Sequence, residues 1–403
     1  MKILLLNLYY PPDTSATAKM AQTVVDTVCI HHRVTVLCGR PSYDPRERLP
    51  WRLYQTENVD LVRIIRAGST AFPRFNMKKR LLNYLSYVWL AVPRALFLDC
   101  DVVLAMTDPP FQGIVGALVA LLKRKPYVYN IRDLYPDMAV GGNIVSAGQL
   151  ARLWERLHRW ALRRAERVIV LGEDMRARII AKGVEPARVV VIRDGVEILP
   201  PEKSPPTPDP EVVRAIRGNF SFVLLHAGNL GFSGAWNTLV TAARRLSKEG
   251  VGLVFVGSGA QRSAVEAAAA GADNIRFLDY FPSKKISSVL VAADAHIVTI
   301  KRGLEGVVVP SKMYGILAAG EPIIAVAPKE TDVVSLGAKQ GFGVAADPDK
   351  PAELVAVVRG LMADLKKLQS MGQAARTAAP SYDRVLELHK YLELFHLFET
   401  DWP

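Results

Sequence analysis

Short apolar runs alternate with stretches of helical periodicity along most of the 403 residues. Runs with the length and composition of buried strands lie in the first half at residues 3–6, 33–37, 61–65, 102–106, 127–131, 168–171 and 189–192. Five more follow at residues 222–226, 253–256, 275–278, 295–300 and 323–326. Helical stretches, such as residues 149–167, separate most of these runs. The alternation predicts an α/β fold with a doubly wound, Rossmann-like unit in each half.

A proline-rich stretch divides the two series of strands. Residues 199–211, "LPPEKSPPTPDPE", hold six prolines and almost nothing that a core would bury, which is typical of a connection between domains. We therefore predict a first domain over residues 1–198, a second over 212–380, and a closing segment, 381–403, with an amphipathic helix at 383–398. Ligands bind at the carboxyl ends of strands in open parallel sheets, so each domain is expected to present one site to a cleft between them.

Composition points to an anionic partner and a reducing environment. The chain has 51 Lys and Arg against 39 Asp and Glu, a net charge of +12, which suits a nucleotide phosphate, a nucleic acid or an acidic membrane surface. The basic residues are interleaved with long aliphatic ones and no recognition helix is evident, which disfavours nucleic acid. Cys29, Cys38 and Cys100 have no metal-like spacing and are too few for a disulfide framework. The amino terminus lacks the pattern of a signal peptide, so a cytoplasmic location is expected.

A basic and aromatic segment spans residues 63–98. It carries no Asp or Glu and seven basic residues: Arg63, Arg66, Arg74, Lys78, Lys79, Arg80 and Arg94. Its aromatic residues include Phe72, Phe75, Tyr84, Tyr87 and Trp89. The apolar stretch at 81–98 is interrupted and falls short of the about 20 residues that cross a bilayer. The composition is typical of a surface on anionic lipid headgroups, although a core helix with a solvated basic end fits equally well.

The first predicted strand runs into "YYPPDTSATAKM", residues 9–20. Two prolines end the strand, and four residues that can cap a helix follow: Asp13, Thr14, Ser15 and Thr17. Free amides at the start of that helix would face the carboxyl end of the strand, where they suit an anion or a sugar hydroxyl. An ordinary strand-to-helix turn explains the same pattern.

Two glycine loops follow strands in the second half. "LLHAGNLGFSG" contains Gly228, Gly231 and Gly234, and "VFVGSG" contains Gly257 and Gly259. Absent side chains let backbone amides approach a diphosphate. Neither loop is the full dinucleotide fingerprint, and glycines follow strands in many folds, so each loop alone is weak evidence.

Charged residues crowd the stretch between the strand at 295–300 and a helix predicted to start near Pro310. They are Lys301, Arg302, Glu305 and Lys312, with Ser311 beside the last. A proline, a hydroxyl, a cation and the unpaired amides of a helix start suit a pyrophosphate. Glu305 adds an acceptor for sugar hydroxyls. A solvated charged loop is the alternative interpretation.

These motifs together resemble the family 4 retaining glycosyltransferases of the GT-B fold, in the branch that builds bacterial O-antigen, colanic acid and similar surface polysaccharides. The motifs, in chain order, are "YYPP" at residue 9, "DVVLAMTDPP" at 101, "NIRDLYPDMAV" at 130, "RVIVLGEDM" at 167, "VIRDGVE" at 191, "HAGNLG" at 226, "NIRFLDYFP" at 274 and "EGVVVPSKMYGILAAGEP" at 305. The resemblance implies transfer of a sugar from a nucleotide diphosphate sugar to an acceptor hydroxyl. It also implies retention at the anomeric carbon and no bound metal or other cofactor.

The resemblance places a UDP-sugar on the second domain and the acceptor on the first. The donor residues it implies are Gly228, Asn229, Gly231, Gly257, Gly259, Tyr280, Phe281, Arg302, Gly306 and Ser311. The acceptor residues are Asp13, Thr14, Ser15, Thr17, Asp108, Arg132 and Asp137. Lys312 would stabilise the departing diphosphate, Glu305 would meet the transferred sugar, and Asp133 would orient the acceptor. The donor sugar is expected to be a UDP-N-acetylhexosamine or a deoxy relative.

The resemblance also implies that the closing helix packs back on the first domain and that the enzyme lies on the inner face of the cytoplasmic membrane. There it would act on a polyprenyl-diphosphate-linked acceptor. Two positions depart from the family pattern. Gly315 stands where a glutamate usually contacts the ribose, and "GFSGAWNTL" lacks the basic pair that often follows the first glycine loop.

Three other functions remain open at this point. The same chemistry can serve a soluble, antibiotic-type acceptor. The same architecture can serve a UDP-sugar 2-epimerase, for which His226 and Glu305 are the obvious acid and base candidates. The glycine at position 315 is also compatible with a protein that binds a nucleotide sugar without turning it over.

Overall fold

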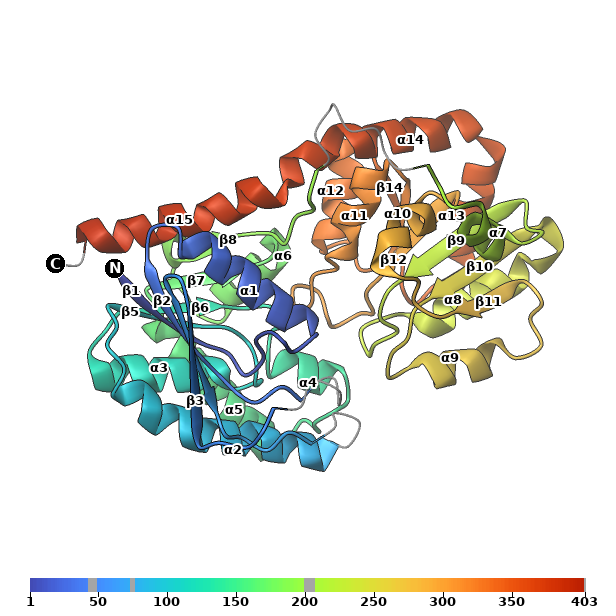
Figure 1. Ribbon diagram of the computed structural model, residues 1–403. Coiled ribbons are helices and arrows are strands. Elements are labelled where there is room, and N and C mark those ends of the chain that lie inside the picture. Colours follow the sequence, from blue (N-terminus) through green and yellow to red (C-terminus); the bar gives the residue numbers. More distant parts are fainter. Residues whose placement is uncertain (43–48, 73–76, 199–206, 402–403) are drawn as a thin grey trace. The chain divides into compact units, whose positions relative to one another are not determined.

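The computed structural model describes residues 1–42, 49–72, 77–198 and 207–401. Within them the chain forms two compact units, which we describe separately. Unit 1 comprises residues 1–192 and 386–403, and unit 2 comprises residues 193–385. Each unit is built on a mainly parallel sheet with helices on both faces (Figure 1), which confirms the predicted pair of doubly wound α/β units.

The described part of unit 1 holds an eight-stranded sheet in the order β3-β4-β2-β1-β5-β6-β7-β8. Its strands are β1 (Lys2–Leu6), β2 (Arg33–Cys38), β3 (Tyr54–Val59), β4 (Val62–Ala67), β5 (Val102–Ala105), β6 (Tyr127–Asn130), β7 (Arg167–Val170) and β8 (Val189–Val191). All seven predicted strands are present. The sequence missed β3, which pairs antiparallel with β4 at the sheet edge. Its side chains are mostly exposed, so the sequence "YQTENV" lacks a buried apolar run.

Helices cover both faces of this sheet. They are α1 (Ala16–Val28), α2 (Met77–Leu96), α3 (Gln112–Lys123), α4 (Asp137–Gly141), α5 (Gln149–Arg164), α6 (Glu173–Ala181), the short η2 (Pro186–Arg188) and the closing α15 (Arg384–Asp401). α1 and α15 lie on one face, and α2, α3 and α5 lie on the other (Figure 1). α15 buries Tyr391, Leu394, Phe395 and Phe398 in the same core cluster as Ile3 and Leu5 of β1. Their spacing of three or four residues is a helical stripe, which joins the end of the chain to unit 1.

The described part of unit 2 holds a six-stranded parallel sheet in the order β11-β10-β9-β12-β13-β14. Its strands are β9 (Phe222–Ala227), β10 (Val251–Val256), β11 (Ile275–Leu278), β12 (Ala295–Thr299), β13 (Ile323–Val326) and β14 (Gly343–Ala346). Its helices are α7 (Pro210–Arg217), α8 (Trp236–Arg245), η3 (Ser247–Glu249), α9 (Arg262–Ala269), η4 (Ser283–Lys285), α10 (Ile286–Leu290), α11 (Lys312–Ala319), α12 (Asp332–Gln340), α13 (Pro351–Ala363), α14 (Leu365–Ala378) and η5 (Ala379–Tyr382). The five predicted strands are present. β14, the short edge strand "GVAA", was not predicted.

The predicted connection, residues 199–211, is wrong at its end. Residues 199–206 lie outside the described residues, but Pro210 and Glu211 begin α7. Asp209 is the N-cap, and its side chain accepts a hydrogen bond from the Glu211 amide. An Asp, a Pro at the first helical position and an acidic first turn are strong helix-start signals, which the high proline content obscured.

Each sheet has one point at which the strand order reverses. In unit 1 it lies between β1 and β5, and in unit 2 between β9 and β12. The carboxyl ends of the two strands at such a switch point diverge and leave a crevice for ligands. The predicted site residues of each unit follow these strands and their immediate neighbours in the sheet.

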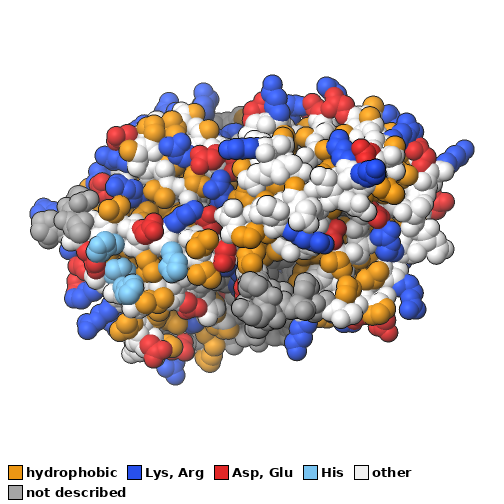
Figure 2. Space-filling model, turned by 90° about the horizontal axis from the view of Figure 1, so that it is seen from above, with side chains coloured by type: hydrophobic (Ala, Val, Ile, Leu, Met, Phe, Trp, Pro, Cys, Tyr) orange, Lys and Arg blue, Asp and Glu red, His pale blue; other side chains and the backbone are white. Residues whose placement is uncertain are grey.

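Surface charge is mixed on the face of each unit that Figure 2 shows. Basic and acidic side chains are interspersed over the described part of this face (Figure 2). The net charge of +12 is therefore not concentrated there. Among the described residues, no helix is long and apolar enough to cross a membrane.

Candidate active site

The two glycine loops of unit 2 pack directly on each other. Backbone hydrogen bonds continue beyond the strands, from the Gly228 amide to the Val256 carbonyl at 2.8 Å and from the Leu230 amide to the Ser258 carbonyl at 3.0 Å. A Cβ on Gly257 would collide with the Gly228 carbonyl oxygen, and one on Gly259 would lie 2.5 Å from Oδ1 of Asn229. The glycines are therefore required for loop packing, whether or not they also approach a ligand.

Lys312, the first residue of α11, reaches over the first glycine loop. Its Nζ lies 3.0 Å from Nε2 of His226 on β9, and 3.1 Å from the position that a Cβ on Gly228 would occupy. Gly228 has φ of +137°, a conformation that suits glycine alone. The sequence predicted a cation near the start of this helix, although α11 begins two residues after Pro310. The resemblance placed both Lys312 and Gly228 at the diphosphate, but the contact of Lys312 with His226, 86 residues away in sequence, was not predicted.

The environment of Lys312 makes its protonated form less stable. Burial lowers the pKa of Lys312 to about 7, and burial followed by the Lys312 charge lowers the pKa of His226 well below its ordinary value. A neutral His226 can accept a hydrogen bond from the ammonium group. Lys312 thus lies in a site that would hold its proton more firmly if an anion were bound beside it.

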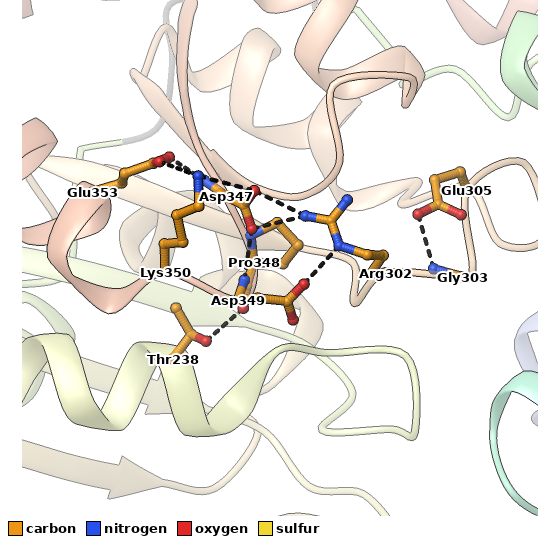
Figure 3. Close-up of polar contacts among 9 residues, drawn as sticks. All are labelled: Thr238, Arg302, Gly303, Glu305, Asp347, Pro348, Asp349, Lys350 and Glu353. Carbon is orange, nitrogen blue, oxygen red and sulfur yellow. Dashed lines mark hydrogen bonds and ion pairs between the residues drawn. The ribbon is translucent and has the colours of Figure 1, made fainter.

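The loop that follows β12 positions Arg302 and Glu305 differently. Arg302 donates from Nε to Asp349 at 2.6 Å and from Nη2 to Asp347 at 2.8 Å, beyond the end of β14 (Figure 3). Its side chain is 53% exposed. Glu305 lies on the other side of the loop and accepts a hydrogen bond from the Gly303 amide at 2.8 Å. Arg302 therefore fastens this loop to the one that follows β14, and two carboxylates already balance the charge that was predicted to serve the donor.

The remaining predicted donor residues lie around the same strand ends. Ser311 is the N-cap of α11 and is exposed, Gly306 is buried in the loop before it, and Asn229 is exposed beside Gly231. The Gly231 carbonyl accepts a hydrogen bond from the Trp236 indole at 2.8 Å. Tyr280 is 58% exposed after β11, whereas Phe281 packs on the core cluster of α7 and α10. The structure thus brings these residues to the ends of β9, β11 and β12.

The sequence missed Arg262, which joins the second glycine loop to the residue before Tyr280. Its Nη1 donates to the Gly257 carbonyl at 2.6 Å and to Oδ1 of Asp279 at 2.5 Å. Its Nε donates to Glu266 one helical turn later at 2.7 Å. The Arg262–Glu266 spacing is visible in sequence as an i,i+4 pair, but the contact with Asp279 is not.

Gly315 has room for a side chain. A Cβ there would meet only Cδ1 of Leu290, at 3.8 Å, which is ordinary van der Waals contact. The absence of the glutamate that the family pattern places here is therefore not imposed by steric crowding in α11.

In unit 1, hydrogen bonds tie together the turns that follow β1, β5 and β6. Asn7 donates from Nδ2 to the Tyr9 carbonyl at 2.7 Å and accepts from the Asp108 amide at 3.2 Å. The Arg132 amide donates to the Thr107 hydroxyl at 2.7 Å. Since β1, β5 and β6 are neighbours in the sheet, the predicted acceptor residues Asp108, Arg132 and Asp133 come to one edge.

The turn at the start of α1 follows the expected capping chemistry. Ser15 is the N-cap, and its hydroxyl accepts a hydrogen bond from the Ala18 amide at 3.0 Å. Asp13 is buried and accepts from the Ser42 amide at 3.1 Å, whereas Thr14 is exposed. Burial raises the pKa of Asp108, and a hydrogen bond with Thr17 opposes that rise. Thr17 therefore joins α1 to the turn after β5.

Asp137 is held by a different set of residues. Its carboxylate forms ion pairs with Arg178 at 2.9 Å and with Lys182 at 2.7 Å, and Lys182 also pairs with Glu155 at 2.8 Å. Burial alone would raise the pKa of Asp137, but the Lys182 and Arg178 charges outweigh it and lower the pKa. The structure thus gives Asp137 partners on α6 and at its C-cap that fix α4 in place, and its predicted contact with the acceptor gains no support.

The basic and aromatic segment divides between the surface and the interior. Arg66 is buried and donates to the Pro11 carbonyl at 2.5 Å, and Tyr84 and Tyr87 are buried too. Lys78, Lys79 and Trp89 are exposed. Arg74 and Phe75 lie outside the described residues. One side of α2 therefore packs into unit 1, as the core-helix alternative expected, and its other side remains exposed.

Arg80 and Tyr84, one turn apart on α2, lie at the same edge as the acceptor turns. Nε of Arg80 donates to the Tyr84 hydroxyl. Burial opposes the charge of Arg80, but Tyr84, Tyr9, Tyr135 and Asp108 outweigh it and raise the pKa of Arg80. The sequence assigned Arg80 to the basic surface. The Arg80–Tyr84 spacing was the one signal that these two residues act together.

Two family models match this chain, one in each half. Residues 28–195 match a glycosyl transferase 4-like domain, and residues 218–378 match the glycosyl transferases group 1 domain. The probable glycosyltransferase WbjE of Pseudomonas aeruginosa is 25% identical over 79% of this chain and 82% of its own length. The putative colanic acid biosynthesis glycosyl transferase WcaI of Escherichia coli K12 is 25% identical over 89% of this chain and 91% of its own.

Solved structures share the fold. Sucrose-phosphate synthase from Thermosynechococcus elongatus matches with a TM-score of 0.72 at 14% identity, over 100% of both chains. Anabaena HepE, in a complex with UDP-glucose, matches with a TM-score of 0.65 at 19% identity, over 98% of this chain and 99% of its own. The two family models lie in the predicted order, one on each doubly wound unit. The chain therefore belongs to the family 4 glycosyltransferases with the GT-B fold.

Proposed function

We propose that this chain is a retaining glycosyltransferase that uses a UDP-sugar, needs no bound metal, and acts in the synthesis of a bacterial surface polysaccharide. WcaI is named for colanic acid biosynthesis, and HepE has been crystallised with UDP-glucose, which supports this pathway class and this donor class. The donor sugar we propose is an N-acetylhexosamine or a deoxy relative.

The observation that carries the proposal is the position of Lys312. Its ammonium group lies over Gly228 at the switch point of unit 2, beside the start of α11. Breaking the bond from the anomeric carbon to phosphate leaves negative charge on the diphosphate. A cation and backbone amides at the leaving oxygens would stabilise that charge in the transition state. The low pKa of Lys312 suits this role, since an incoming diphosphate would restore its proton.

Retention requires no protein base in this proposal. The departing phosphate oxygen takes the proton of the acceptor hydroxyl on the same face of the sugar, so the new bond replaces the old one there. Glu305 would accept hydrogen bonds from the hydroxyls of the transferred sugar. Asp133 would orient the acceptor rather than attack the anomeric carbon.

We also propose that the acceptor is linked to a lipid. The helices α2, α3 and α5 lie on the same face of unit 1 (Figure 1). All three helices carry exposed apolar side chains. The exposed set is Leu81, Leu82, Leu85, Trp89, Phe97, Leu118, Leu121, Leu122, Leu150, Leu153 and Leu157. Lys78 and Lys79 add exposed positive charge. Apolar and basic side chains together suit the surface of an anionic membrane.

Product analysis tests the proposed chemistry. UDP-sugars that raise the melting temperature of the protein would be incubated with it, with and without EDTA, and the released sugar examined by NMR for anomeric configuration. We expect slow release of UDP and of sugar with retained configuration, unchanged by EDTA. A 2-epimer of the donor would instead establish the epimerase. Donor binding without any release or transfer would establish a binding protein.

Vesicle binding tests the lipid-linked acceptor. We expect the protein to bind vesicles that contain phosphatidylglycerol, and the double variant L85S/W89S to lose most of that binding. L365S removes an exposed leucine from unit 2 and is the control. Equal binding by all three proteins, or none by the wild type, would favour a soluble acceptor.

A further inference from the structure

We propose that Arg80 binds a phosphate group of the acceptor at the switch point of unit 1. This inference rests on the proposed function, because it assumes that the acceptor lies on unit 1, and it names the acceptor's chemistry: a sugar joined to phosphate or diphosphate.

The hydrogen-bonding state of Arg80 is the first observation. The guanidinium has five donors, and the Tyr84 hydroxyl accepts from Nε. No hydrogen bond or ion pair of the terminal Nη atoms is found with any residue in the described part of the chain. Four donors in a planar fork therefore remain for a ligand, and such a fork matches the oxygens of a phosphate.

The second observation is how firmly the side chain is held. The guanidinium carbon lies 5.4 Å from the ring centroid of Tyr84, and that ring packs edge-on against Phe111 at 6.2 Å. Tyr84 and Tyr9 are buried. The Nε atom and one face of the guanidinium are thus held by Tyr84. Because the group is already fixed, it loses little conformational entropy when its Nη atoms bind an anion.

The third observation is the place of Arg80 on α2. Leu81, Leu82, Leu85 and Trp89 on the same helix are exposed, whereas Tyr84 and Tyr87 are buried. Arg80 thus lies between the apolar surface of the helix and the turns after β1 and β5. In a lipid-linked sugar the phosphate lies between the lipid and the sugar. A phosphate bound by Arg80 would leave the lipid at the exposed face and the sugar near Asp108.

Asp108 limits what this site can accept. Its carboxyl group acts on Arg80, and burial raises the pKa of Asp108 while Thr17 donates a hydrogen bond to it. A carboxylate beside the cation repels an anion that enters deeply, so the phosphate is expected to meet the outer Nη atoms only. Asp108 would then face sugar hydroxyls.

Binding of inorganic pyrophosphate to the full chain tests this proposal, with UDP present at saturation so that the donor site is filled. R80Q should raise the dissociation constant for pyrophosphate about 10- to 100-fold, the range expected when a hydrogen bond to a charged group is lost. The control R188Q removes one positive charge from unit 1 at the end of η2, and should change the constant less than threefold. Both variants should bind UDP as the wild type does.

Two outcomes would overturn the inference. One is equal pyrophosphate affinity in wild type and R80Q. The other is loss of binding to phosphatidylglycerol vesicles in R80Q with pyrophosphate affinity intact, which would place Arg80 in the membrane surface instead. Y84F, which removes the acceptor from Nε, should weaken pyrophosphate binding less than R80Q does. Failure of the wild type to bind UDP would count against the proposed function, and the pyrophosphate comparison made without UDP would still decide the role of Arg80.

Discussion

The switch point of unit 2 is lined mainly by backbone groups, whereas that of unit 1 is lined mainly by side chains. In unit 2 the edge consists of backbone: two glycine loops in direct contact, with Lys312 above Gly228. In unit 1 the edge consists of side chains: phenols, Arg80, Asp13 and Asp108, joined by Asn7 and Thr17. Backbone amides at a sheet edge can approach a ligand closely, but they offer the same chemical groups in every protein. A side-chain edge can differ widely between proteins of one fold.

This difference suits the two ligands we propose. Every nucleotide-sugar donor carries the same diphosphate, which amides and one cation can bind whatever the sugar is. Acceptors share no such group, so their recognition depends on particular side chains. Variants in unit 2 should therefore affect transfer to every acceptor, and variants in unit 1 should affect some acceptors only.

The largest effect is expected for Lys312. K312M removes the cation at the leaving oxygens and should lower the turnover number about 100-fold, equivalent to about 3 kcal/mol of transition-state stabilisation. Steady-state kinetics with any active acceptor would measure it. K339M, which removes an exposed lysine from α12, is the control and should retain full turnover. A turnover number of K312M within threefold of the wild-type value would contradict the role of Lys312 at the leaving oxygens, and with it the contrast drawn between the two switch points.

The second largest effect is expected for Gly257. In G257A the new methyl group would collide with the Gly228 carbonyl at a φ of +141°, which separates the two loops. We expect a loss of about 2 kcal/mol in the free energy of unfolding, together with weaker UDP binding. Denaturant unfolding and calorimetry would measure both quantities. G360A, at a position with open space around the Cβ, should not destabilise the protein and tests whether glycine replacement as such is harmful.

A smaller effect of opposite sign is expected for Gly315. It lies inside α11, where a Cβ has room, so G315A should raise the free energy of unfolding by about 0.5–1 kcal/mol. G315E would place a carboxylate where the family pattern has one, and should tighten UDP binding if the ribose lies there. Destabilisation by G315A would show that the glycine is needed for another reason.

The smallest effect is expected for Arg302. Its side chain is half exposed and paired with Asp347 and Asp349, so R302A should cost less than about 1 kcal/mol of stability. Because those carboxylates already balance its charge, we expect the Michaelis constant for the donor to change less than threefold. A tenfold rise in the Michaelis constant for the donor would instead show that Arg302 contacts the donor, as the sequence predicted.

Local patterns were sufficient to predict most of the fold. Buried strands such as β1 and β9 are continuous apolar runs, and the Ser15 cap and the end of α11 at Gly320 follow from local chemistry. β3 was missed because it is exposed at a sheet edge, where pairing with β4 rather than burial defines it. The start of α7 was missed because its prolines were taken as part of a connection.

The candidate site was predictable only in part, because its decisive contacts join distant segments. The sequence placed Lys312 at a helix start but not beside His226, and it placed Arg302 among the donor residues without its carboxylate partners. It placed Asp137 among the acceptor residues without its ion pairs to Arg178 of α6 and to Lys182 just after α6. The role that we propose for Arg80 depends on which side of α2 faces inward. The periodicity of the sequence did not specify that side.

The most direct test of the account is the pH dependence of UDP binding from pH 7 to pH 9, measured by calorimetry for wild type and K312M. Burial lowers the pKa of Lys312 to about 7, so the free enzyme loses this proton as the pH rises through 7. UDP needs the protonated form, and its own phosphate is already ionised in this range, since its second pKa is about 6. We predict that the wild-type dissociation constant rises up to about tenfold per pH unit, whereas that of K312M is higher at pH 7 and nearly constant. Equal and pH-independent affinity in both proteins would contradict the claim that Lys312 binds the diphosphate.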